Sequence, residues 1–155
     1  MIRELSPAAL PEWEHFSALP DLEKSRLGPA SPWLEAGQVQ TFSLEEGGRS
    51  LARVSAMVNP RLQDQEVPTG LLGCFSFPDE AFDKHQEGLR ELMSCATAWL
   101  RGRQMARVRA PMNFTTWYSY RAETASSDYP RFPGEDVLDE RYAKFLAQTM
   151  KPIGT

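Results

Sequence analysis

The alternation of apolar and polar residues is clearest in the middle of the chain, where it predicts three strands. Gln38–Leu44 and Ser50–Val58 alternate as the two faces of a sheet require, and Glu45–Gly48 between them ends in the glycine pair of a tight turn. Gly70–Phe77 is apolar on both faces, which is typical of a strand in the centre of a sheet. We therefore expect an antiparallel hairpin followed by a buried strand.

Two longer segments have the spacing of amphipathic helices. One long helix is predicted over about Glu80–Arg103, with an apolar stripe that packs against the sheet. This stripe consists of Phe82, Leu89, Leu92, Met93, Ala96, Trp99 and Leu100. A short strand, Ala106–Ala110, follows and ends at Pro111, and a last helix is predicted over about Val137–Met150.

Composition limits the class of protein. With a first strand at Ile2–Leu5 and a helix at Pro7–Leu19, the elements make an α/β (α+β) chain whose 155 residues fit a single domain, residues 1–155. The formal charge of -4 offers no footprint for nucleic acid, and no apolar run reaches the length of a membrane span. The N-terminus lacks the apolar region of a signal peptide, and Cys74 and Cys95 cannot form a disulfide framework. We expect a cytoplasmic protein with two free thiols and neither a nucleic-acid nor a membrane partner.

Several short motifs occur in an order and at a spacing typical of one protein family. They are Leu51–Arg61, Gly70–Phe75, Ala98–Arg103, Arg107–Asn113, Tyr142–Leu146 and Lys151–Thr155. With them the chain, over roughly residues 38 to 155, resembles GNAT-type acyl-CoA N-acyltransferases. It looks most like a group of bacterial GNAT-like proteins, many of them uncharacterised, whose strands read "GR(I/V)AAIVNPR" and "GFFGFF" and which also carry "RVRGPMN".

The resemblance implies a mixed, mainly antiparallel sheet flanked by helices, which splays between its fourth and fifth strands. Acetyl-CoA or another acyl-CoA would be the cosubstrate in that opening, and a small-molecule amine would be the acceptor. By the same resemblance, the pantetheine arm pairs with the fourth strand, and its slot would be lined by Cys74, Phe75, Ser76 and Phe77. The pyrophosphate would lie at the start of the next helix, as anions do at helix N-termini, with Lys84 close by.

The segment that would bind the phosphates departs from the family pattern. It has no glycine before Gly88, and it carries Asp79, Glu80 and Asp83, which suit a helix dipole but repel a pyrophosphate. Two functions therefore stay open. The first is an acyl-CoA-dependent N-acyltransferase acting on an unidentified amine. The alternative is a non-catalytic binding or interaction module of the same fold with a degenerate phosphate loop.

N-acyl transfer needs an acid for the departing thiolate, and a tyrosine often supplies it in this family. Two positions compete for this role. Tyr120 follows Asn113 at the family's offset, with Thr116 at the small-residue position between them. Tyr142, on the last predicted helix, matches the group's own motif better. The alternative for each is a packed tyrosine whose hydroxyl finds a partner.

Aromatic and hydroxyl residues follow the strand Ala106–Ala110, and open α/β sheets bind ligands at strand ends. The resulting candidates for an acceptor or acyl pocket are Asn113, Thr116, Trp117 and Tyr118. Ordinary core and loop packing is the alternative. His15 and His85 lie far apart with no cysteine or carboxylate at ligand spacing, so no metal site is predicted.

The family fold closes with a seventh strand, whereas Thr155 comes where only a sixth can begin. We therefore expect a sheet without this last strand. The chain would then be a truncated part of a larger protein, or a partner chain would supply a strand, or the edge would stay open. An open edge tends to pair, so a homodimer is our hypothesis.

Overall fold

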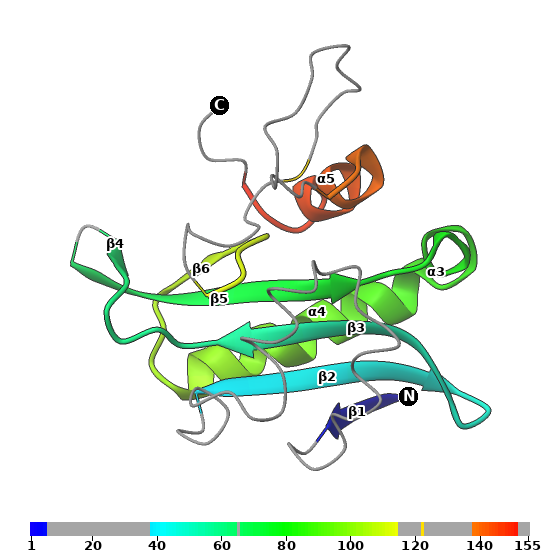
Figure 1. Cartoon of the computed structure of the whole chain (residues 1–155), viewed down its shortest axis with the longest axis horizontal. Helices are drawn as coiled ribbons and strands as arrows, with labels where there is room; N and C mark the ends of the chain where they lie inside the picture. Colours follow the sequence, from blue (N-terminus) through cyan, green and yellow to red (C-terminus); the bar gives the residue numbers. More distant parts are fainter. Residues whose placement is uncertain (6–37, 65, 115–121, 123–137, 152–155) are drawn as a thin grey trace, which may run out of the picture.

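The centre of the fold is a mixed, mainly antiparallel sheet (Figure 1). The computed structural model describes residues 1–5, 38–64, 66–114, 122 and 138–151. In chain order the strands are β1 (Ile2–Leu5), β2 (Val39–Glu46), β3 (Arg49–Met57), β4 (Gln63–Asp64), β5 (Val67–Ser76) and β6 (Arg107–Arg109). Strands β1, β2, β3 and β5 lie side by side, and β5 also pairs with β6 and with β4. The predicted fold class and first strand are confirmed, and the two-residue β4 lies where a loop was expected.

The β2–β3 hairpin forms as the alternation predicts. Gly47 and Gly48 take φ values of 57° and 78°, which glycine adopts without the penalty that a side chain would bring. Phe42 lies opposite Val54 in the resulting register, and both side chains are buried in the main core. Period-two alternation thus gives the hairpin one face that is apolar except for Gln40.

The opposite face of the hairpin is polar and buried. Thr41 Oγ1 and Ser55 Oγ share a hydrogen bond of 2.7 Å, and so do the hydroxyls of Ser43 and Ser50. Arg53 Nε donates to Ser50 Oγ at 3.0 Å, and its side chain is only 3% exposed. Residues on both faces of β2 and β3 are therefore buried, and the hydroxyl groups on the second face are hydrogen-bonded to one another.

The single long helix of the sequence prediction is wrong, because the structure has two helices. α3 (Asp79–Lys84) ends at His85, whose φ of −125° is not helical, and α4 (Gln86–Gly102) begins directly after it. The apolar spacing assigned Phe82 to the stripe of the long helix. Phe82 instead packs against Phe77, so the break lets α3 contact the end of β5 while α4 covers the sheet.

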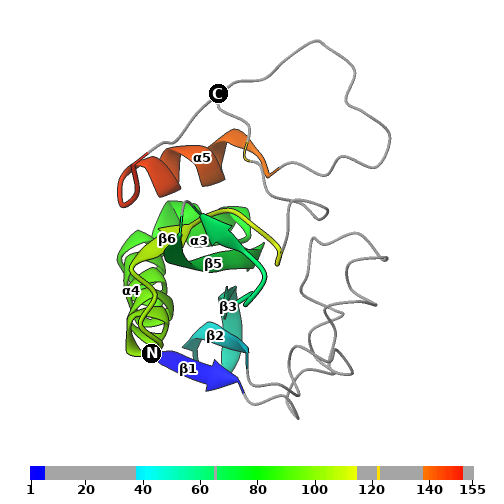
Figure 2. The same ribbon diagram turned by 90° about the vertical axis from the view of Figure 1, so that its left-hand side faces the viewer.

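α4 covers the apolar face of the sheet, as Figure 2 shows from the side. Its buried residues are Leu89, Leu92, Met93, Ala96 and Leu100, all in the predicted stripe. Gly88 allows the helix to approach the sheet, because a Cβ there would lie 2.9 Å from the side chain of Leu44 on β2. Among the helices of the described ranges, none is long and apolar enough to cross a membrane.

The last helix, α5 (Glu140–Ala147), is shorter than predicted at both ends. Asp139 is its N-cap, and its side chain accepts a hydrogen bond from the backbone N–H of Arg141. In both views α5 lies next to β5 and β6 (Figures 1 and 2). The helix predicted over Pro7–Leu19 falls outside the described residues.

Candidate functional site

β5 and β6 run parallel and pair only over the first part of β5. The ladder ends where Leu71 lies opposite Arg109, and one further backbone bond joins Met112 N to Leu72 O at 2.9 Å. β6 ends there, whereas β5 continues to Ser76. The last residues of β5 therefore extend beyond the strand that pairs with its beginning, as the resemblance to the family implies.

A β-bulge lies in β5 at the point where the ladder with β6 ends. Ser55 of β3 lies opposite Gly73, and Arg53 lies opposite Ser76, so two steps along β3 match three along β5. Cys74, inside the bulge, has a φ of 50°, which is uncommon for a residue with a side chain. A bulge of this kind bends a strand and changes the direction of its polar groups. The end of β5 is therefore turned relative to its first half.

The residues after β6 are held against the sheet by side-chain amides. Asn113 Oδ1 accepts a hydrogen bond of 2.6 Å from the backbone N of Cys74. Asn59, which follows β3, donates from Nδ2 to the carbonyl oxygen of Phe114 at 2.9 Å. Asn59 and Asn113 are both buried. Asn113, predicted to bind substrate, is thus built into the junction between the two strands and takes the place of a backbone partner.

The side chain of Tyr142 performs a similar role at the far end of β5. Its hydroxyl accepts a hydrogen bond of 2.7 Å from the backbone N of Phe77 and donates one of 3.1 Å to the carbonyl oxygen of the same residue. The side chain is 6% exposed, and this burial is the main cause that raises the pKa of Tyr142 to about 12. Tyr142 is therefore packed with its hydroxyl hydrogen-bonded, which is the alternative to a catalytic role that the sequence left open for this residue.

An aromatic cluster holds the ring of Tyr142 in place. The ring stacks on Phe77 with centroids 5.5 Å apart, and it meets Phe82 edge-on at 5.0 Å. Phe75 lies edge-on to both Phe77 and Tyr142. Phe145 of α5 completes the cluster. The side chains of Phe75 and Phe77 are therefore part of the core between β5, α3 and α5.

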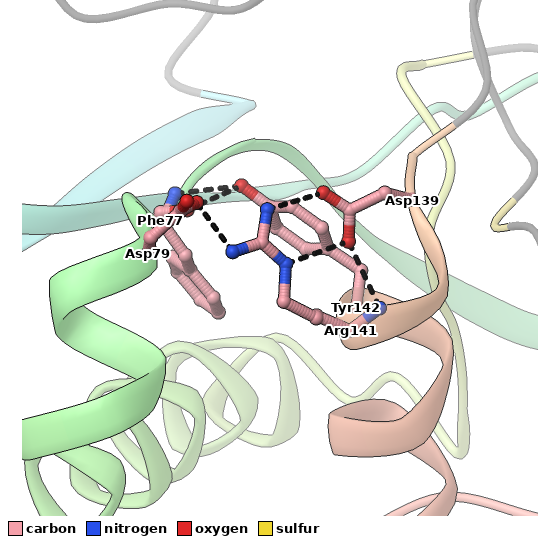
Figure 3. A network of polar contacts seen from close by, with 5 residues as sticks. All are labelled: Phe77, Asp79, Asp139, Arg141 and Tyr142. Carbon is pink, nitrogen blue, oxygen red and sulfur yellow. Dashed lines mark hydrogen bonds and ion pairs between the residues drawn. The ribbon is translucent and has the colours of Figure 1, made fainter.

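Arg141 links α5 to the first turn of α3 at the surface (Figure 3). Its guanidinium forms ion pairs with Asp79 and with Asp139, the latter at 2.9 Å. The hydrogen bond from the Arg141 side chain is the main cause that lowers the pKa of Asp139. In turn, the carboxylates of Asp139 and Asp79 raise the pKa of Arg141. The side chains of Arg141, Asp79 and Asp139 are 42%, 76% and 45% exposed, respectively. Water and salt therefore screen these ion pairs.

Lys84, predicted to lie near the pyrophosphate, has a carboxylate partner of its own. Its Nζ lies 3.0 Å from Glu80 Oε1, one helical turn earlier, and both side chains are exposed. This contact lowers the pKa of Glu80 and raises that of Lys84. Lys84 is the last residue of α3, away from the helix's first turn, which carries Asp79 and Glu80. The first turn of α3 is therefore acidic, as the sequence indicated.

The structure brings together part of the predicted site. Cys74 meets Asn113, and Phe77 meets Tyr142, so both ends of the β5 segment predicted to bind pantetheine contact predicted site residues. Ser76, half-buried, lies opposite Arg53. The remaining candidates lie outside the described residues; they are Thr116, Trp117, Tyr118 and Tyr120. Within the described ranges, no group of three or more His, Cys, Asp or Glu side chains gathers as at a metal site.

Sequence reasoning missed three residues that shape this region. Asn59 and Arg141 stand within or beside motifs that carried the family resemblance, at the end of the β3 motif and directly before Tyr142. Asp139 stands three residues before Tyr142, and an Asp ahead of an apolar-periodic segment is a recognisable N-cap signal. The contact of Arg141 with Asp79 has no such signal, because the two residues are distant in sequence.

Comparison with solved structures identifies the fold. No known family model matches the chain, and no curated protein does. A structure of similar fold is the aminoglycoside acetyltransferase meta-AAC0020 from an uncultured soil metagenomic sample, in complex with sisomicin. It has a TM-score of 0.58 and 12% identity and covers 100% of this chain and 89% of that chain. The aminoglycoside acetyltransferase AAC(6')-Iy, in complex with the bisubstrate analog CoA-S-monomethyl-acetylneamine, has a TM-score of 0.53, 14% identity and coverage of 85% and 97%. The chain therefore has the GNAT fold, which confirms the fold that the motifs predicted.

Proposed function

We propose that this GNAT-fold chain is an acyl-CoA-dependent N-acyltransferase that acts on a small-molecule amine. The observation that carries the proposal is the short ladder between β5 and β6: β6 ends at Arg109, whereas β5 continues to Ser76. The backbone amides and carbonyls of such a strand edge can pair with an added extended chain. A pantetheine arm, with its successive secondary amides, has the required chemistry. Acetyltransferases of similar fold, one with a CoA-containing analog, support acyl-CoA as the cosubstrate.

In this proposal each predicted site residue keeps a defined role. The main chain of Cys74–Phe77 binds the pantetheine arm, and Lys84 contributes to the charge near the phosphates. The acceptor amine lies among the residues after β6, which are Asn113, Thr116, Trp117 and Tyr118. The amine attacks the thioester carbonyl, the C–S bond breaks, and an acid protonates the departing thiolate.

Tyr120 is the acid that we favour, and Tyr142 is the second candidate. The hydroxyl proton of Tyr142 is directed to the carbonyl oxygen of Phe77, so it can reach a thiolate only after that bond opens. A raised pKa also makes Tyr142 a weaker acid than an ordinary tyrosine. The variants Tyr120→Phe and Tyr142→Phe separate the two, since the true acid loses turnover on substitution. Equal turnover of both variants and the wild type would reject both assignments.

The alternative function is a non-catalytic binding or interaction module. It is favoured by one observation, the charge at the start of α3. Asp79 and Glu80 stand in the first turn, and the one basic residue of this helix, Lys84, is paired with Glu80. Carboxylates at this position repel a pyrophosphate. If this reading is right, the chain has the fold without the affinity for acyl-CoA.

Thermal unfolding in the presence of acetyl-CoA tests the proposal at little cost. A ligand at 100 times its dissociation constant stabilises the folded state by about 2.7 kcal/mol. We expect a rise in Tm of several degrees at millimolar acetyl-CoA. No rise would count against the transferase and favour the module. A rise without release of free CoA thiol across a panel of primary amines would identify a binding protein instead.

Three further expectations belong to this proposal. A single domain over residues 1–155 and a cytoplasmic location follow from composition and stay predictions. We also keep the homodimer of the sequence analysis as a proposal, since the edges of sheets tend to associate. Sedimentation equilibrium tests this last point. A constant monomer mass across a wide concentration range would contradict it.

A further inference from the structure

We propose that Tyr142 is a placeholder: its hydroxyl holds the main-chain N–H and C=O of Phe77 by hydrogen bonds until a ligand takes over those bonds. This inference rests on the proposed acyl-CoA site, and it concerns how that site becomes available. It assigns Tyr142 a positioning role: the residue competes with the pantetheine arm for the edge of β5 and does not protonate the thiolate.

The hydrogen bonds of Tyr142 are those that a neighbouring strand would make. The N–H and the C=O of Phe77 are both satisfied by one hydroxyl, at 2.7 and 3.1 Å. At the near end of the same segment, Asn113 Oδ1 accepts from the N–H of Cys74. Two side chains thus cap the two ends of a segment that spans roughly 10 Å of extended chain. In this arrangement the edge that the ligand needs is already occupied at Phe77.

Tyr142 and a ligand compete for Phe77 because each polar group can form only a limited number of hydrogen bonds. A backbone N–H has one proton to donate, and the hydroxyl of a tyrosine has one as well. While Tyr142 accepts from the N–H of Phe77, that N–H cannot donate with full strength to a pantetheine carbonyl. A ligand that pairs with Phe77 must therefore displace the hydroxyl, and the cost of that displacement lowers its apparent affinity.

The surroundings show what has to move. The ring of Tyr142 is stacked on Phe77 and buried against Phe82, so it cannot leave by turning alone within the cluster. α5 as a whole is joined to α3 at the surface through Arg141 and Asp79. These ion pairs are exposed and screened by salt, and they are weak compared with the buried contacts. Displacement of Tyr142 therefore corresponds to a shift of α5 away from the end of β5.

The test compares CoA binding by the wild type with binding by Tyr142→Phe, using titration calorimetry. Removal of the hydroxyl frees the N–H and the C=O of Phe77 for the ligand while keeping the ring. We expect the variant to bind CoA about 5- to 50-fold more tightly, the range that corresponds to one or two hydrogen bonds, although its Tm falls. A loss of stability together with a gain in affinity is a result that a purely structural role would not produce.

Phe145→Leu is the matched control. It loosens α5 in the same aromatic cluster, since Phe145 packs edge-on to Phe77, but it leaves the hydroxyl of Tyr142 in place. We expect its CoA affinity to stay within about twofold of the wild type. Equal tightening in both variants would assign the competition to the helix as a whole and overturn the role of the hydroxyl.

Other outcomes are equally decisive. Weaker binding by Tyr142→Phe would mean that the hydroxyl contacts the ligand, which overturns the placeholder. Unchanged binding in both variants would also overturn it and would leave the acyl-CoA proposal intact. Failure of the wild type and of both variants to bind millimolar CoA would overturn the proposed function and the placeholder together.

A measurement on the wild type covers the case in which the variant does not fold. Amide hydrogen exchange is followed with and without saturating CoA. We expect exchange in α5 (Glu140–Ala147) to become faster on binding, because the helix gives up its contact with β5, while exchange at Phe77 stays slow. Slower exchange in α5 would mean that the ligand tightens the contact, and the inference would be wrong.

Discussion

The hydroxyl of Tyr142 satisfies both main-chain polar groups of Phe77, a residue 65 positions earlier in the chain. This contact joins the end of β5 to the helix that follows β6, across the region where the two strands part. Asn113 makes the corresponding contact with Cys74 at the other end of that region. Two side chains therefore supply hydrogen bonds to the main chain in this region, and both can be tested by conservative substitution.

Tyr142→Phe should destabilise the protein without changing its core packing. The substitution leaves the N–H and C=O of Phe77 buried and without their hydroxyl partner, and such a loss costs about 1–3 kcal/mol. Urea unfolding followed by circular dichroism measures the change, with an unchanged m-value as the sign that the folded state is intact. A loss below about 0.5 kcal/mol would mean that water replaces the hydroxyl, and that the site is more open than the structure indicates.

Stability should fall at alkaline pH through the same residue. Burial raises the pKa of Tyr142 to about 12 in the folded state, above the usual value of 10.0 that the unfolded chain retains. Between these values the unfolded state holds fewer protons, so the free energy of unfolding decreases as pH rises. The contribution is fully present below pH 10 and is lost by about pH 12, with a size of up to about 2.7 kcal/mol.

The control for this pH dependence is Tyr142→Phe itself. Lysines and other tyrosines also titrate in this range, so the relevant quantity is the difference in unfolding free energy between wild type and variant. We expect this difference to shrink between pH 10 and pH 12. A constant difference over that range would show that Tyr142 ionises normally in the folded protein.

Gly73→Ala should be strongly destabilising, whereas Gly102→Ala should not. A Cβ on Gly73 would lie 2.3 Å from the carbonyl oxygen of Met112 and 2.5 Å from Asn113 Oδ1, and the first of these is backbone that cannot rotate away. Overpacking of this kind costs about 1–3 kcal/mol, and more where the backbone must shift. Gly102, the last residue of α4, has no atom within 4 Å of such a Cβ, and alanine favours a helix.

Thermal unfolding of the two glycine variants gives the comparison directly. We expect Gly73→Ala to lower Tm by several degrees and Gly102→Ala to leave it unchanged or slightly raised. If both variants melted like the wild type, the close approach between β5 and the residues after β6 would not exist in solution.

Asn113→Ala should cost more stability than Asn113→Asp. Alanine removes the acceptor of the Cys74 N–H and leaves a buried donor, at about 1–3 kcal/mol. Aspartate keeps an oxygen at the same position, although its charge is unfavourable in a buried site. Chemical unfolding measures both. A loss below about 0.5 kcal/mol for Asn113→Ala would mean that the hydrogen bond to Cys74 contributes little to stability.

Local patterns predicted most of the sheet. The hairpin, the central strand and the short strand before Pro111 follow from alternation and turn residues, because these signals act over a few neighbouring positions. The apolar spacing also marked the stripe of α4 correctly. It could not place the break at His85, because Phe82 fits the helical period of α4, although it packs against Phe77 directly after β5 and against Tyr142 of α5.

For the candidate site, the sequence motifs indicated which residues to consider. The structure shows the positions of those that lie in the described ranges. Tyr142 is a catalytic candidate by resemblance and Asn113 a substrate-binding candidate from its place after a strand end, and both are buried and hydrogen-bonded to the main chain of Phe77 and Cys74, respectively. Nothing in the sequence around Tyr142 reveals the N–H and C=O of Phe77 as its partners. The roles of Tyr120, Thr116, Trp117 and Tyr118 remain predictions, since these residues lie outside the described ranges.

The sequence by itself determined most of the strands, the apolar stripe of α4 and the GNAT fold to which they belong, because periodicity, turn residues and family motifs are local in the chain. Only the tertiary structure decided that the end of β5 is capped by Asn113 and Tyr142 and that Arg141 joins α5 to α3. Such contacts join residues that are distant in sequence, and they depend on how separate elements approach one another. Backbone groups left over where two strands part must find partners, and packing determines which side chains are near enough to supply them.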